Sequence, residues 1–180
     1  MVRPYASPEG FSMIKATAFQ SLQPLYAETD EQLEAFRKEM FVIKDPSLVA
    51  LSKHPIFPDR ADYMPSGFFR STGDSVTKDL GTALDMKDFK ELLAKKFAGR
   101  STAEIFEEPA PGPFFEFIHF NENGQHYMIG PKTSEKLARD FADHHGQAEA
   151  LGGAFYARFM SLKLCFETAQ RSGAVRFSGP

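Results

Sequence analysis

Two of the five histidines, His119 and His126, are spaced so that a β-hairpin would bring their imidazoles together. They flank Asn123-Gly124, a pair that adopts the positive φ angles of a tight turn, and the segments on either side are rich in residues that favour strands. With a two-residue turn the histidines lie diagonally on one face, and with a four-residue loop they are directly opposed. A carboxylate such as Glu122 would complete a two-histidine metal site.

Asp143 and Glu116 are alternative carboxylates for that site. The chain lacks the spacings HxH, HxxxH and HExxH that metal sites usually leave, so a structural or surface role of the histidines is favoured. We expect no cofactor, with a divalent metal as the alternative. The adjacent pair His144-His145 is a poor chelate because neighbouring helical side chains point about 100° apart. A protonated imidazole near a helix C-terminus is the favoured role of that pair.

A second candidate site is a proline-framed loop that carries Asp59, Arg60, Asp62 and Tyr63. It supplies an acid, a base and a hydroxyl within residues 54–67, a stretch with three prolines. Such a loop is ordered by its prolines and suits binding or catalysis, although loops of this kind are more often solvated connectors.

The elements that position these residues are marked by periodicity and by capping residues. A hairpin is predicted over residues 113–130, and strands over 13–19, 41–43, 68–72 and 173–177. Thr29 is predicted to cap a helix over 30–40 with Leu33, Phe36 and Met40 on one face. Asp85 is predicted to cap a helix that ends near Gly99. A short helical or turn segment is expected over 45–51, a helix from Thr133 or Ser134, and a last helix over 154–171.

Composition indicates one globular α+β domain with an antiparallel sheet covered by about four helices. The 180 residues include 19 Phe and no Trp, so the core is expected to consist mainly of Phe rings. The net charge of −3 gives no general attraction for phosphate backbones, and nucleic acid is an unfavoured partner. Residues 1–12 are predicted to be a loosely ordered extension, and residues 13–180 the domain.

The single cysteine, Cys165, lies in an apolar helical context and is predicted to be a core residue. A chain with one cysteine forms no internal disulfide, which favours a reducing compartment. The sequence also has no signal peptide and no stretch of about 20 apolar residues, so we expect a cytoplasmic protein without a membrane partner.

Several segments of the last third resemble a family of uncharacterised proteins of bacteria, prophages and tailed phages. They are residues 113–118, 129–141 with an Ile-Gly-Pro turn, and 165–177 with a terminal Ala-Val-x-Phe strand. Residues 55–61 and the strand that opens at Met13 are similar to the family as well. The resemblance implies an accessory gene of phages and mobile elements, but these motifs mark turns, caps and core positions and imply no catalytic residue.

Two functions follow as expectations. The first is non-enzymatic binding to a host or phage protein or to a small ligand, as an inhibitor or anti-defence factor would do. The second is a small metal-assisted or nucleotide-directed hydrolase that uses His119 and His126. The lack of catalytic signatures favours the first. Homo-oligomerisation is left open.

Overall fold

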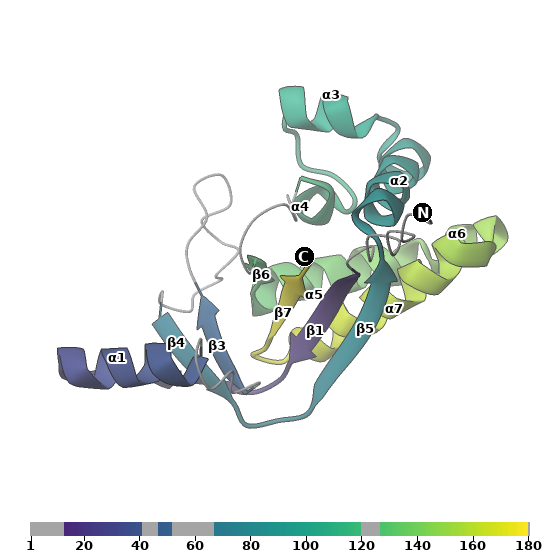
Figure 1. The fold of residues 1–180 in the computed structure, drawn as a ribbon. Helices are drawn as coiled ribbons and strands as arrows, with labels where there is room; N and C mark the ends of the chain where they lie inside the picture. The colour runs from purple at the N-terminus through teal and green to yellow at the C-terminus, as the bar shows by residue number, and fades with distance from the viewer. Residues whose placement is uncertain (1–12, 41–46, 52–66, 120–126, 180) are drawn as a thin grey trace, which may run out of the picture.

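The larger of two sheets lies at the centre of the fold. The computed structural model describes residues 13–40, 47–51, 67–119 and 127–179. Four antiparallel strands form this sheet in the order β5 (Ser75–Gly81), β1 (Ile14–Phe19), β7 (Ala174–Ser178) and β6 (Tyr127–Ile129). Helices α5 (Pro131–Asp143) and α7 (Gly153–Ala169) lie behind it in the view of Figure 1.

The two faces of this sheet differ in chemistry because side chains alternate along each strand. Ala16 and Ala18 of β1 and Val175 and Phe177 of β7 point toward the helices and are buried. Lys15 and the other intervening residues point to the opposite face. No helix of the described ranges packs on that second face, so the described helices cover the large sheet on one side only.

A bend joins this sheet to a smaller one. Strand β1 continues as β2 (Leu22–Leu25), and its partner β5 is preceded by β4 (Gly67–Ser71), which pairs with β2. The four strands therefore form one antiparallel ribbon with a bend in the middle. At the bend Ser21 has φ of 49°, and its carbonyl oxygen accepts from the Thr72 hydroxyl at 2.9 Å. Strand β3 (Leu48–Leu51) completes the small sheet in the order β2-β4-β3.

The angle between the two sheets is filled by an apolar cluster, which we call the corner cluster. It consists of buried residues of both sheets, with Met128 packed against them: Phe19, Leu22, Val49, Phe69 and Ala174. The small sheet is thus fixed against the end of the large sheet by burial as well as by the continuous ribbon.

The main core lies between the large sheet and the helices and is dominated by phenylalanine, as predicted. Phe141 is fully buried and packs edge to face against Phe159 with ring centroids 4.6 Å apart. The remaining elements around this core are α2 (Ala83–Leu93), the π-helical η3 (Ala94–Ala98), α3 (Thr102–Glu107), α4 (Phe115–Ile118) and α6 (His145–Leu151). No helix of the described residues is long and apolar enough to cross a membrane.

The predicted α+β class and single domain are confirmed, and the described ranges hold seven α-helices and one π-helix where about four helices were expected. Strands β1, β4 and β7 and helices α1 (Asp30–Lys38) and α7 match the predicted segments. Gly99 ends η3 with φ of 67°, as its position predicted. The predicted strand over 41–43 and the extension 1–12 lie outside the described residues.

The predicted hairpin over 113–130 is wrong in its first half. Residues 115–118 form helix α4, and β6 pairs with β7 instead. Phe114 has φ of 56°, and its amide donates to the Asp140 carboxylate at 2.8 Å, which turns the chain into α4. A helical turn places Phe114, Phe117 and Ile118 on one side, and all three are fully buried.

Three local predictions also need correction. Thr82, not Asp85, is the N-cap of α2, and Asp85 is the third residue of a capping box. Helix α5 begins at Pro131, before Thr133, because proline is favoured at the first helical position. Residues 48–51, expected to be helical or a turn, form strand β3, because they pair with β4 and bury Val49 opposite Phe69.

Candidate functional site

Helix α1 and the small sheet form the most exposed apolar site of the described residues. The helix begins because the Thr29 side chain accepts a hydrogen bond from the Gln32 amide at 3.3 Å. The Gln32 side chain in turn accepts from the Glu28 amide at 2.7 Å. Acidic residues in the first turn and Arg37 and Lys38 in the last turn complement the helix dipole. The sequence therefore specifies α1 locally.

Few tertiary contacts hold this helix. None of its residues is buried, and in Figure 1 it lies at one end of the molecule beside β4. The ring of Phe36 contacts that of Phe68 on β4 at 6.0 Å between centroids. Just beyond the helix, Glu39 receives a bond of 3.0 Å from the Arg70 guanidinium. An amphipathic helix normally buries its apolar stripe, and α1 leaves its stripe partly exposed.

A hollow of about 330 Å³ lies between α1 and the small sheet, and we call it the α1 hollow. Its walls are the start of α1, the segment before it and the first residues of β4: Leu25, Tyr26, Ala27, Glu28, Thr29, Asp30, Leu33, Phe36, Gly67 and Phe68. Tyr26 is 77% exposed, although a phenol ring offers a large contact area. The lining therefore combines apolar side chains with the polar groups of Glu28, Thr29 and Asp30.

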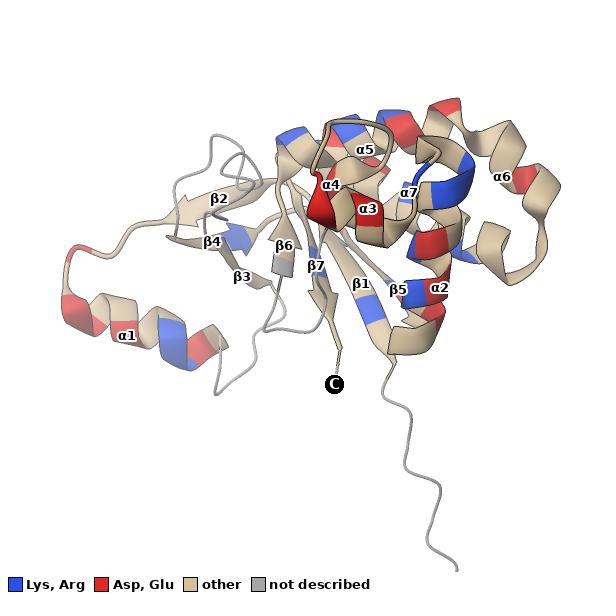
Figure 2. Cartoon of the chain, turned by 90° about the horizontal axis from the view of Figure 1, so that it is seen from above, with Lys and Arg blue, Asp and Glu red and all other residues tan. Residues whose placement is uncertain are grey.

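The rim of the α1 hollow is acidic. Residues 28–39 carry five acidic and two basic side chains, a net charge of −3, which equals the formal charge of the whole chain. Figure 2 shows these charges along α1. Arg37 pairs with Glu34, and Arg70 pairs with Glu39. Two of the remaining acidic residues, Glu28 and Asp30, line the hollow.

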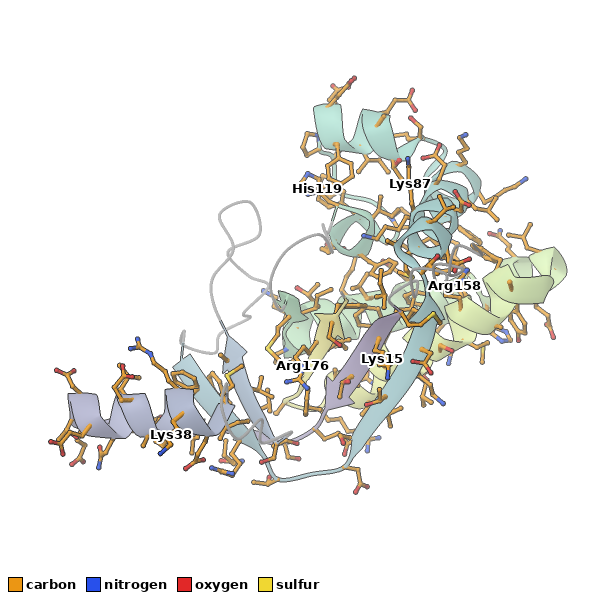
Figure 3. All side chains as sticks on the ribbon, viewed as in Figure 1. Lys15, Lys38, Lys87, His119, Arg158 and Arg176 are labelled. Carbon is orange, nitrogen blue, oxygen red and sulfur yellow. The ribbon has the colours of Figure 1, made fainter. Side chains whose placement is uncertain are left out.

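His119, a candidate metal ligand for which a structural or surface role was favoured, is buried between α3 and α4 (Figure 3). Its ring lies 4.7 Å from that of Phe106 and 5.7 Å from that of Phe115. The other residues of that prediction, His126 and Glu122, lie outside the described residues. The loop residues Asp59, Arg60, Asp62 and Tyr63 do so as well.

The alternative carboxylates have structural roles or lie apart. Glu116 accepts from the Lys136 ammonium at 2.6 Å, and the same ammonium lies 2.8 Å from Asp140. This cluster holds the turn that precedes α4 against α5. Asp143 is exposed at the end of α5. Within the described ranges, no three His, Cys, Asp or Glu side chains are grouped so that they could hold a metal ion.

His144, His145 and Cys165, the other titratable side chains considered in the sequence analysis, form contacts within the fold. His144 is at the end of α5, as predicted, and its Nδ1 lies 2.9 Å from the Asp140 carbonyl oxygen. His145 contacts the Tyr156 hydroxyl at 2.9 Å. Cys165 is fully buried, as predicted, and burial raises the pKa of its thiol to about 11. A thiol with this pKa is a weak nucleophile at neutral pH.

The α1 hollow was not predicted from the sequence. The stripe of Leu33 and Phe36 was the available signal, but it predicted only a helix with these residues on one face. Tyr26 and Phe68, which lie opposite that stripe, are 42 residues apart in the sequence numbering, and pairing of β2 with β4 brings them together.

Comparisons with protein-family models, with curated proteins and with solved structures found no match for this chain. The resemblance to phage-associated proteins stays a prediction.

Proposed function

We propose that this chain is a cytoplasmic accessory protein of phage or mobile-element type that binds a partner protein through the α1 hollow, without catalysing a reaction. The observation that supports the proposal is an amphipathic helix with no buried residue beside an open hollow that is lined by both apolar and polar groups. Exposed apolar surface of this kind costs solubility, and in soluble proteins it commonly marks an interaction site.

The chemistry of the hollow defines the partner segment. Leu25, Leu33, Phe36 and Phe68 favour an apolar anchor such as leucine or phenylalanine. The acidic rim favours lysine or arginine on either side of that anchor, because complementary charge accelerates association and rejects acidic partners. The preferred segment is therefore an apolar side chain flanked by basic residues.

The expected affinity is modest. A volume of about 330 Å³ is near the lower end for ligand sites, so we expect a dissociation constant of roughly 10–100 μM for an isolated segment. The basic residues of the partner should remain solvated at the rim, so binding should weaken as salt screens the charges.

The test is a fluorescence anisotropy titration with two labelled peptides, one with leucines flanked by lysines and one with the lysines replaced by glutamates. The lysine peptide should bind at least about tenfold more tightly. The variant Leu33→Ala/Phe36→Ala should lose this binding. The matched control Leu84→Ala/Leu164→Ala, which removes two exposed leucines from α2 and α7, should retain it.

Two outcomes would contradict the proposal. One is equal binding of the lysine and glutamate peptides. The other is binding of the lysine peptide that the Leu33→Ala/Phe36→Ala variant does not weaken.

A further inference from the structure

Arg176 is partly buried in the middle of the second face of the large sheet, on which no described helix packs. It is opposite Thr17 on β1 and opposite Met128 on β6. Its neighbours in β7, Val175 and Phe177, are buried on the helix side. Figure 3 shows the Arg176 side chain on the side of β7 next to the small sheet. The guanidinium is therefore located at the mouth of the angle between the two sheets.

The apolar surroundings of Arg176 desolvate its charge. The guanidinium carbon lies 5.0 Å from the ring centroid of Phe19, a member of the corner cluster that is 2% exposed. This stacking fixes the plane of the guanidinium. Burial lowers the pKa of Arg176 from its ordinary value, although an arginine remains protonated at neutral pH.

Two other partly buried cations of this fold, Arg158 and Lys136, have oxygen partners, and Arg176 differs from these two. Arg158 donates to the Leu80 carbonyl oxygen at 2.5 Å and lies 3.6 Å from Asp85. Lys136 has two carboxylate partners. In the part of the chain that the structure describes, no hydrogen bond or ion pair is formed by the Arg176 guanidinium. Partial burial of an unpaired guanidinium is unfavourable, because the charge loses hydration. Its N–H donors remain free to bind a group from outside the protein.

Hydroxyl groups and one lysine surround this guanidinium on the same face. The hydroxyl of Thr17 lies 3.1 Å from that of Thr77 on β5. Ser178 is two residues along β7 from Arg176 and is opposite Lys15. The Lys15 ammonium is 3.9 Å from the Asp79 carboxylate, which offsets its charge. Among the described residues of this face, one positive charge is therefore left uncompensated, at Arg176.

We propose that Arg176 binds a carboxylate group of a ligand at the mouth of the angle between the two sheets, outside the corner cluster. A guanidinium offers two parallel N–H donors that match the two oxygens of a carboxylate. One uncompensated positive charge balances one carboxylate, whereas a phosphate dianion would need a second free cation, and Lys15 is already beside Asp79. The Thr17 and Ser178 hydroxyls supply further donors, and Phe19 and Met128 supply apolar contact for the rest of the ligand. This site is separate from the α1 hollow, which lies on the other side of the small sheet.

The test follows the Arg176 side-chain Nε–Hε signal by NMR while succinate is added at constant ionic strength. The signal is assigned by its absence from Arg176→Lys. We expect a saturable shift with half-saturation in the millimolar range, about what one charge-assisted contact gives in water. Parallel titrations with sodium phosphate and with sodium chloride test other anions. The Nε–Hε signal of Arg158 is the internal control, because this group already donates to the Leu80 carbonyl oxygen.

Variants separate binding from packing. Arg176→Met keeps the apolar stem on Phe19 and removes the charge, so it should fold with a similar urea midpoint and lose the succinate-induced shifts of the Thr17 and Ser178 amides. Thr17→Val, which retains Arg176, should weaken succinate binding a few-fold. This second variant keeps the test decisive if Arg176→Met fails to fold.

Three results would overturn the proposal. A linear shift that chloride reproduces would indicate ionic screening only. Tighter binding of phosphate than of succinate would assign a different ligand. Unchanged succinate binding in Thr17→Val together with retained shifts in Arg176→Met would place the ligand elsewhere.

Discussion

Removing the apolar stripe of α1 should cost little stability, because the stripe is only partly buried. In Leu33→Ala/Phe36→Ala the fold loses two partly exposed side chains and one ring contact at 6.0 Å. An aromatic pair contributes about 0.5–1.5 kcal/mol beyond its buried area, and alanine, the best helix former, restores part of the loss. We expect a decrease of about 1–2 kcal/mol in the free energy of unfolding.

The decrease in the free energy of unfolding expected for this variant can be compared with that of a core substitution. Phe141 is fully buried, and Phe141→Ala should cost about 3–5 kcal/mol through lost burial and the cavity left behind. Urea denaturation followed by circular dichroism measures both variants. In thermal unfolding, each kcal/mol should lower Tm by about 2–4 °C for a chain of this size.

The refuting result is a loss in Leu33→Ala/Phe36→Ala as large as that in Phe141→Ala. It would mean that α1 packs as a core helix and that its stripe is explained by stability alone. The control Leu84→Ala/Leu164→Ala should change the free energy of unfolding by about 1 kcal/mol or less, as expected for exposed positions.

Three further predictions concern the rest of the fold. Gly173→Ala should cost more than about 3 kcal/mol in urea denaturation, because a Cβ there would lie 1.8 Å from the Phe19 carbonyl oxygen, and a loss below about 1 kcal/mol would contradict this backbone packing. Hydrogen bonds from the Thr102 hydroxyl and amide and the Lys95 ammonium lower the pKa of Glu91 from 4.5 to about 2. The stability advantage of the wild type over Glu91→Gln should therefore be full above about pH 4.5 and disappear as the pH falls toward 2, and a pH-independent difference would refute this. Cys165 should react with a thiol reagent at pH 8 only after unfolding, and rapid reaction of the native protein would contradict its burial.

Local signals predicted the elements that depend on local interactions. Thr29 caps α1 through Gln32, and Gly99 ends η3 with a positive φ, as their residue types indicated. Helix α7 and strand β7 were predicted with nearly correct bounds, because apolar residues between glycines define them.

Elements set by distant contacts were mispredicted or missed. The segment around Phe117 has strand-forming residues, but Asp140, 26 residues from Phe114, accepts the Phe114 amide and favours a helical turn. Strand β5 was not predicted, because its sequence Ser75–Gly81 has little alternation of apolar and polar residues. Pairing with β1 stabilises the strand.

The two candidate sites were hidden for the same reason. Arg176 was seen only as a residue of a terminal strand, and its place on the second face of the large sheet follows from the register with Thr17. The α1 hollow requires the bend at Ser21 and the pairing of β2 with β4, neither of which leaves a pattern in the sequence.

The central claim, that the α1 hollow binds a basic and apolar segment of a partner protein, is tested most directly by locating the bound peptide. Backbone amide shifts of the ¹⁵N-labelled protein should be measured during titration with the lysine-flanked leucine peptide. The account predicts that the largest shifts occur at Leu25, Tyr26, Leu33, Phe36 and Phe68, and that the Leu84 and Leu164 amides stay unchanged. Largest shifts outside residues 22–38 and 67–71, or no saturable shift at all, would contradict it.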